Sequence, residues 1–280
     1  MNIRPLPAFN DNYLWLIEGE EETWVVDPGD GEVVAAALEK SQRTLTGILI
    51  THHHSDHVGG IGYLMHKDLI VAGPATSKHP KVNRPLSEGE SIILCNRLFS
   101  VMDVPGHTHN HIAYYSRPES PDAENHDTES HDMSGNPPQS ANSLYRTPIL
   151  FSGDTLFAGG CGRIFDGTFE QLHDSLARIA LLPSDTAVYC AHEYTLNNLG
   201  FALTLEPSNQ ALQSRIVACQ AQRHKGQPTV PSRLSDELET NPFLRTHSQE
   251  IQASARRKHP QMQSDAKSIF SAIRSLKDNF

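Results

Sequence analysis

The chain has 280 residues and a formal net charge of −10 at pH 7. It is long enough to bury a sizeable core, as one large domain or two modest ones. The acidic balance argues against a nucleic-acid-binding protein, which usually has a basic face, but leaves room for a local basic pocket that binds a small anion. Sixteen histidines are many for this length and are the first indication of a metal site.

The cysteines and the apolar segments indicate a cytoplasmic protein. The four cysteines lack the spacing of a zinc–thiolate site or a disulfide framework, so we expect free thiols in a reducing compartment. The first residues lack a signal-peptide core, and no uninterrupted apolar run approaches about 20 residues. We therefore expect neither nucleic acid nor a membrane as a partner, and we expect the protein to act as a monomer.

In the first part of the chain, apolar runs lead to a dense group of histidines. Residues 12–17 and 23–26 predict two strands of a hairpin, residues 33–40 a short helix and residues 45–50 a third strand. The sequence then reads T-H-H-H-S-D-H over residues 51–57. A strand that ends in imidazoles and a carboxylate indicates metal ligands.

Side chains alternate in direction along an extended segment. His52 and His54 should therefore point one way and share an ion, whereas His53 should point the other way as a packing or supporting residue. Asp56 and His57 follow after the chain turns and can reach a second ion.

Further along the chain, three more strands end in residues that can bind a metal. Short strands are also predicted at 70–71, 91–95 and 111–115, and residues 169–182 predict an amphipathic helix with an apolar face. Residues 97–104 predict a strand that leads to His107, residues 148–151 a strand that leads to Asp154, and residues 187–190 a strand that leads to His192.

Two changes of composition divide the chain. Residues 116–147 are rich in Ser, Pro, Asn, Asp and Glu and predict a mobile surface insertion, so we interpret His126 and His131 as solvated loop residues. Helical patterns dominate at the C-terminus. We predict a mixed catalytic domain over 1–193 and a helical domain over 194–280. The expected C-terminal helices are 196–205, 209–223, 248–258 and 265–276.

The candidate ligands are too many for one catalytic ion, which usually takes three protein ligands and a water molecule. They suit two ions about 3.5–4 Å apart that share a bridging carboxylate and a bridging hydroxide. Taken alone, the residues at 106–108 would more often form an ordinary turn and those at 152–154 a helix cap. The 52–57 cluster differs, because ionisable groups packed there without a metal would cost repulsion and desolvation. The seven candidates are His52, His54, Asp56, His57, His107, Asp154 and His192.

Residues 51–57 resemble the H-x-H-x-D-H signature of the metallo-β-lactamase superfamily, and the later candidates follow in its order. Within it, the chain resembles the glyoxalase II (hydroxyacylglutathione hydrolase) family over nearly its whole length, apart from the insertion. The resemblance implies an α+β fold, a metallo-β-lactamase-type αββα sandwich with a helical C-terminal domain that binds substrate. The closest matches are at 11–13, 26–29, 152–163, 191–195, 240–243 and 274–280.

The resemblance also implies how two divalent metal ions are held. We expect zinc, with iron or manganese as alternatives, because His and Asp ligands suit all three. Asp56 and Asp154 would act in catalysis together with a hydroxide that bridges the ions. The implied ligands are His52, His54 and His107 for a first ion, Asp56, His57 and His192 for a second, and Asp154 between them.

A basic pocket for glutathione is implied as well. Asn110 replaces a glycine of the family's H-T-x-G-H pattern, and we expect it to be tolerated because Asn enters the left-handed conformation more easily than most residues. We interpret His109 as incidental. Without the resemblance, Arg274 and Lys277 would be interpreted as solvated charges on a terminal helix. The implied substrate contacts are Arg163, Phe165 (where some relatives have tyrosine), Tyr194, Arg274 and Lys277.

The implied activity is hydrolysis of S-(2-hydroxyacyl)glutathione, chiefly S-D-lactoylglutathione, to glutathione and D-lactate, the second step of methylglyoxal degradation. The bridging hydroxide would attack the thioester, and a thiolate leaves without a strong acid. One alternative is hydrolysis of another ester, a lactam or a phosphodiester, against which the helical tail argues. A di-iron redox protein would usually need an additional flavin or electron-transfer module, which nothing in the chain supplies, and seven ordered ligands argue against a non-enzymatic metal-binding module.

Overall fold

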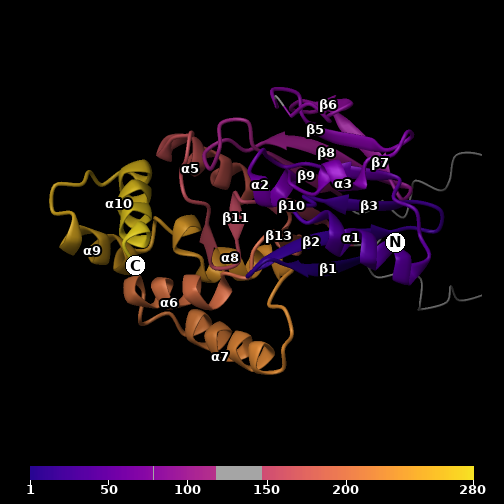
Figure 1. Ribbon diagram of the computed structural model, residues 1–280. Coiled ribbons are helices and arrows are strands. Elements are labelled where there is room, and N and C mark those ends of the chain that lie inside the picture. The colour runs from indigo at the N-terminus through magenta and orange to yellow at the C-terminus, as the bar shows by residue number, and fades with distance from the viewer. Residues whose placement is uncertain (78, 118–146) are drawn as a thin grey trace, which may run out of the picture.

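The computed structural model describes residues 1–77, 79–117 and 147–280. The predicted insertion, with His126 and His131, lies outside the described residues except at its two ends. Two six-stranded sheets pack face to face, and helices cover their outer faces (Figure 1). The expected α+β sandwich of helix, sheet, sheet and helix layers is confirmed.

The first sheet contains the N-terminal third of the chain in sequential order. Its first three strands are antiparallel, and those from β3 onward are parallel. The strands are β1 (Asn2–Ala8), β2 (Asn12–Glu18), β3 (Thr23–Val26), β4 (Gly47–Leu49), β5 (Ile70–Pro74) and β6 (Arg84–Leu86).

The second sheet has the order β14-β13-β10-β9-β8-β7, in which only β10 and β13 are parallel neighbours. A small hairpin, β11 (Leu156–Phe157) and β12 (Gly160–Cys161), follows β10. The strands of the sheet are β7 (Ser91–Leu94), β8 (Arg97–Asp103), β9 (Ile112–Ser116), β10 (Ile149–Gly153), β13 (Ala187–Cys190) and β14 (Ser232–Arg233).

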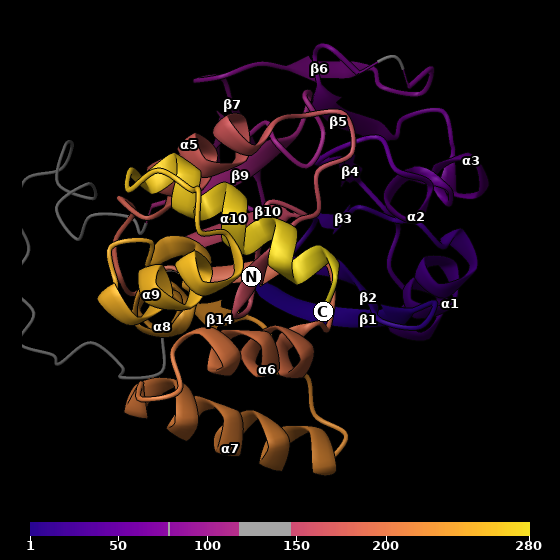
Figure 2. The same cartoon turned by 90° about the vertical axis from the view of Figure 1, so that its left-hand side faces the viewer.

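The helices lie in three places. Helices α1, α2 and α3 pack on the first sheet, and α5 packs on the second. The remaining helices gather at one end of the molecule, where Figure 2 shows α10 crossing in front of the sheets above α6 and α7. They are α1 (Gly31–Ser41), α2 (Ser55–Val58), α3 (Ile61–Leu64), α5 (Phe169–Ile179), α6 (Thr195–Leu205), α7 (Gln210–His224), α8 (Leu234–Thr240), η2 (Pro242–Leu244), α9 (Gln249–Lys258) and α10 (Ala266–Asp278).

Apolar burial holds the layers together. Trp15 and Trp24 of the first sheet pack in one core cluster with Phe99 and Phe151 of the second. Each of these side chains is almost fully buried, which contributes about 2–3 kcal/mol apiece by removal of apolar surface from water. The predicted apolar face of α5 is likewise buried, and a capping box with Thr168 begins that helix.

Several elements were not predicted, among them β1, β14 and α8. β1 contains two prolines, but it lies at the edge of its sheet, where a missing N–H is tolerated. The C-terminal part is helical, as expected, but it also contributes β14 to the second sheet through pairing with β13. Its two-residue strand and the seven-residue α8 are too short for a periodic pattern to indicate them.

Strand direction explains where the candidate ligands meet. The ligand-bearing loops follow the carboxyl ends of β4, β8, β10 and β13. In the second sheet β8, β10 and β13 run in the same direction, so these loops leave the sheet at one edge. In the described parts of the chain, no helix has the length and apolar character needed to cross a membrane.

Candidate metal centre

Three imidazoles converge where the first ion was predicted. His52 Nε2 lies 3.1 Å from His54 Nδ1, which lies 3.0 Å from His107 Nε2. The ligand atoms of a tetrahedral zinc site lie roughly 3.3 Å apart. The three nitrogen atoms therefore have the spacing of ligands to one ion.

The predicted second set also comes together. Asp56 Oδ2 lies 3.4 Å from His57 Nε2 and 3.5 Å from His192 Nε2. These three residues form one group and the three histidines of the first set form another. Within each group, all the ligand atoms lie within 4.8 Å of one another. We call them the second site and the first site.

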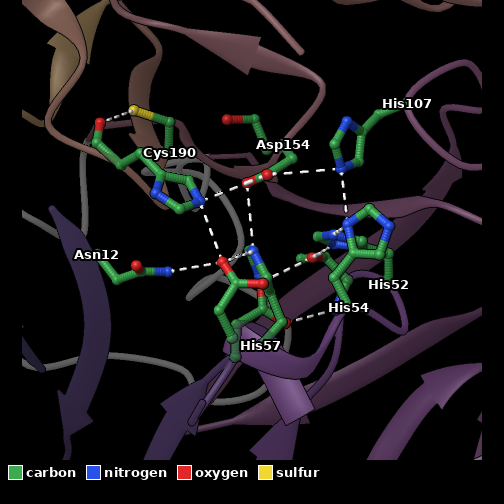
Figure 3. Close-up of polar contacts among 12 residues, drawn as sticks. Asn12, His52, His54, His57, His107, Asp154 and Cys190 are labelled. Carbon is green, nitrogen blue, oxygen red and sulfur yellow. Dashed lines mark hydrogen bonds and ion pairs between the residues drawn. The ribbon is translucent and has the colours of Figure 1, made fainter. Parts of the chain in front are cut away.

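Asp154 lies between the two sites, as Figure 3 shows. Its Oδ2 is 3.5 Å from His107 Nε2 in the first site and 3.4 Å from His192 Nε2 in the second. Its Oδ1 is 3.4 Å from His57 Nε2. A carboxylate in this place can contact two ions at once.

Hydrogen bonds fix the orientation of the buried rings. The Nδ1 atoms of His57, His107 and His192 face the Asp27 carboxylate, the Arg163 carbonyl and the Asp11 carboxylate at 3.0, 2.6 and 2.8 Å. These oxygens only accept, so each Nδ1 carries a proton, and in the neutral ring Nε2 then has a lone pair for a metal ion.

Two buried atoms in the centre have no hydrogen-bond partner, His57 Nε2 and Asp154 Oδ1. Burial opposes the charge of both groups. Nevertheless, Asp154 and Asp27 raise the pKa of His57 well above its usual value, and His57 and His192 hold the pKa of Asp154 well below its usual range. The site thus favours added positive charge, and the lone pairs and carboxylates fit a pair of cations.

The second site depends on a strained loop after β3. Asp27 has a φ of 50°, and its carboxylate accepts from Thr51 N and Thr51 Oγ1, each at 2.7 Å, as well as contacting His57. A Cβ on Gly29 would lie 1.8 Å from Asp56 O, so only glycine permits this approach. No role was predicted for Asp27. Its position directly after a predicted strand, like that of the candidate ligands, is the sequence feature that could have indicated one.

The neighbouring polar residues do not enter the centre. His53 is exposed and points away from the centre, where it contacts Asn110 Oδ1 at 3.1 Å and packs edge-on against His54 with ring centroids 5.2 Å apart. Asn110 does not adopt a positive φ, which corrects the expected left-handed conformation. His109 pairs with Asp166 at 3.4 Å. His111, which was assigned no role, accepts from Asp154 N at 3.0 Å and stacks on His52.

A cavity of about 520 Å³ opens from the two sites toward the C-terminal helices. Arg163 and Lys277 contribute cationic side chains to it, and the Arg163 guanidinium pairs with Asp278 of the same lining at 3.2 Å. Burial and the Arg274 guanidinium lower the pKa of Lys277 to about 8. The lining includes His54, Asp56, His107, Asp154, Phe157, Arg163, Phe165, His192, Tyr194, Asn197, Arg274, Lys277, Asp278 and Phe280.

Arg274 differs from the exposed contact that its pattern implied. Its side chain is 5% exposed, and it donates to Cys161 O at 3.0 Å and to Asp278 Oδ1 at 3.1 Å. It also lies over the ring of Phe243, 5.1 Å from the centroid. The guanidinium is therefore already bonded within the wall of the cavity.

Two aromatic rings flank the centre. Phe165 packs edge-on against His54 and His107, with ring centroids 4.8 and 5.2 Å apart. Tyr194 stacks on His192 at 4.7 Å, and burial together with the charge of Asp11 raises its pKa above the usual value. Both predicted aromatic residues thus lie at the mouth of the cavity, one beside each site.

Family models match both parts of the chain. Residues 9–120 match the metallo-beta-lactamase superfamily, and residues 193–280 match the hydroxyacylglutathione hydrolase C-terminus. Among solved structures, ETHE1 from Myxococcus xanthus is 22% identical, with a TM-score of 0.60, over 99% of this chain and 98% of that one. The BLEG-1 B3 metallo-beta-lactamase is 21% identical, with a TM-score of 0.55, over 87% and 99%. These two structures share the fold.

Curated relatives are closer in sequence. A hydroxyacylglutathione hydrolase of Marinomonas sp. (strain MWYL1) is 42% identical, and one of Pseudomonas paraeruginosa (strain DSM 24068 / PA7) is 43% identical. Each alignment covers 100% of this chain and 100% of the relative. The chain therefore belongs to the hydroxyacylglutathione hydrolase family of the metallo-β-lactamase superfamily.

Proposed function

We propose that the chain hydrolyses S-(2-hydroxyacyl)glutathione thioesters, chiefly S-D-lactoylglutathione, and releases glutathione and D-lactate as the second step of methylglyoxal degradation. The relatives that match over the full chain are named hydroxyacylglutathione hydrolases, which supports this substrate class. The observation that carries the proposal is the single cavity that joins the two ligand sites to the cationic side chains of Arg163 and Lys277.

The cavity suits the shape and charge of the substrate. Glutathione has two carboxylates at neutral pH, and the cations of Arg163 and Lys277 can bind them. Arg274 stabilises the wall through Cys161 and Asp278, so its contribution to binding would be indirect. With the carboxylates bound at the C-terminal helices, the thioester would extend toward the two sites. The helical part from residue 194 onward would thus select the substrate.

The seven ligand residues would hold two divalent cations, which we propose to be zinc. When bound, such a pair lowers the pKa of a water molecule toward neutrality and stabilises negative charge on a carbonyl oxygen. Asp154 and Asp56 supply the anionic oxygens that fix the pair, and the Nδ1 hydrogen bonds keep the imidazole lone pairs directed inward. Phe165 and Tyr194 shield the imidazoles from bulk water at the two sides of the mouth.

We further propose that the protein acts as a monomer in the cytoplasm. The four cysteines are free and buried, which suits a reducing compartment.

The test is hydrolysis of S-D-lactoylglutathione by the zinc-loaded protein, compared with S-D-lactoyl-N-acetylcysteamine and a chromogenic β-lactam. The N-acetylcysteamine derivative has the same lactoyl thioester but lacks both carboxylates of glutathione. We expect kcat/KM to be at least about 100-fold higher for the glutathione thioester, because two charge-assisted contacts are lost in the analogue. A metal-loaded protein that does not hydrolyse the glutathione thioester, or that prefers the β-lactam, would refute the proposal.

A matched pair of variants tests where glutathione binds. Lys277→Met should raise KM several-fold with little change in kcat. Lys267→Met is the control, because the Lys267 ammonium pairs with Asp174 at 2.7 Å outside the cavity. Equal kinetics for the two variants would place the glutathione carboxylates elsewhere.

A further inference from the structure

The turn between β1 and β2, together with the first residue of β2, contacts two of the three residues of the second site. Asp11 Oδ1 lies 2.8 Å from His192 Nδ1, and Asn12 Nδ2 donates to Asp56 Oδ2 over 3.0 Å. Figure 3 shows Asn12 on the opposite side of the centre from the first-site imidazoles. One short turn thus supports ligands that are 44 and 181 residues away in sequence.

Main-chain bonds hold this turn in register with the end of β13. Tyr13 N donates to Ala191 O at 2.7 Å, and Glu193 N donates to Asp11 O at 2.8 Å. Between these bonds, residues 12 and 192 form an isolated antiparallel bridge. Because the bonds lie on both sides of His192, its ring and the Asp11 carboxylate have little freedom to separate.

The groups that face the first-site imidazoles directly carry no net charge, and Asp27 reaches His52 only through Thr51 Oγ1, which donates to its carboxylate at 2.7 Å. His107 Nδ1 faces the Arg163 carbonyl at 2.6 Å, and His52 Nδ1 faces Thr51 Oγ1 at 3.1 Å. A carboxylate behind an imidazole raises its basicity more than a carbonyl or hydroxyl does, because it stabilises positive charge on the ring. The two sites therefore differ in the charge of their supporting groups.

We propose that Asp11 and Asn12 are positioning residues for the ion of the second site alone. Asp11 keeps the proton of His192 on Nδ1 and so directs the Nε2 lone pair to the ion, while Asn12 holds Asp56 Oδ2 in place. The inference rests on the proposed function, because it assumes that both sites bind a cation. Loss of such supporting partners typically weakens metal binding 10–100-fold.

The test is a competition titration of metal-free protein with zinc and a chromophoric chelator, in the absence of substrate, which yields two dissociation constants. His192→Ala and His54→Ala identify which constant belongs to the second site and which to the first. Asp11→Ala should raise the second-site constant about 10–100-fold and leave the first within about twofold. Asn12→Ala should act on the same constant.

A conservative variant separates charge from fold. Asp11→Asn keeps an acceptor oxygen for His192 Nδ1 but loses the charge, so it should raise the second-site constant less than Asp11→Ala does. Asp30→Asn is the matched control, because Asp30 caps α1 through Glu32 N and Val33 N, and Asn preserves such a cap. It should bind zinc as the parent chain does.

The outcomes distinguish a failure of the role proposed for Asp11 and Asn12 from a failure of the proposed function. Equal weakening of both constants by Asp11→Ala, an effect on the first site alone, or no effect would overturn the role of the turn. A parent chain that binds fewer than two zinc ions would instead refute the two-cation basis of the proposed function. Thermal unfolding of the metal-free variants should match that of the parent, which shows that any loss is local to the site.

Discussion

Raising the pH should weaken substrate binding through Lys277. Because the pKa of Lys277 is lowered to about 8, its charged form is present below pH 8 and is lost as the pH rises through that value. With this pKa, roughly 90% of the chains carry the charge at pH 7 and roughly 10% at pH 9. If the ammonium binds a glutathione carboxylate, kcat/KM should fall several-fold over this range, chiefly through a rise in KM, and approach the value of Lys277→Met.

The assay compares pH profiles of kcat/KM for the parent and for Lys277→Arg. A guanidinium keeps its charge throughout, so the variant should lose much less activity above pH 8. The α-amino group of the substrate also titrates at alkaline pH, but both enzymes meet the same substrate. The ratio of the two profiles therefore isolates Lys277. Lys267→Arg, outside the cavity, should follow the parent. Parallel profiles for the parent and Lys277→Arg would refute the reasoning.

Three further changes test other parts of the account. Asp154→Asn should lower kcat by about 10³-fold or more and reduce bound zinc, measured by atomic emission, because it removes the charge shared by both sites; normal zinc content with normal kcat would contradict this. Arg274→Ala should lower the free energy of unfolding in urea by about 2–4 kcal/mol, whereas the exposed Arg178→Ala should cost less than about 1 kcal/mol; a change in KM alone would make Arg274 a direct substrate contact. Gly29→Ala should destabilise by about 1–3 kcal/mol and lower zinc affinity, since its Cβ meets the Asp56 backbone; unchanged unfolding would show that the loop yields freely.

The grouping of the candidate ligands was predictable because their pattern is local. Strands and the residues that follow them can be recognised over a few positions, and parallel strands bring such residues to one edge. The structure places His52, His54 and His107 in one group, and Asp56, His57 and His192 in another, with the spacing that ligand sets require.

The supporting contacts were not predictable, because they join distant segments. Asp11 and His192 are 181 residues apart, and nothing in the local sequence of either indicates the other. The burial of Arg274 follows from the packing of α10 on Phe243 and Cys161, which a helical pattern does not specify. β1 was missed because its prolines disfavour a strand, and only its place at the sheet edge makes them acceptable.

Activity measured against bound metal tests the central claim most directly. Metal-free protein, prepared with a chelator, would be titrated with zinc while hydrolysis of S-D-lactoylglutathione is followed. We expect no turnover at the start and a rise that reaches its plateau near two zinc ions per chain. Turnover that persists without metal, or a protein that binds two zinc ions and leaves the thioester intact, would contradict the account.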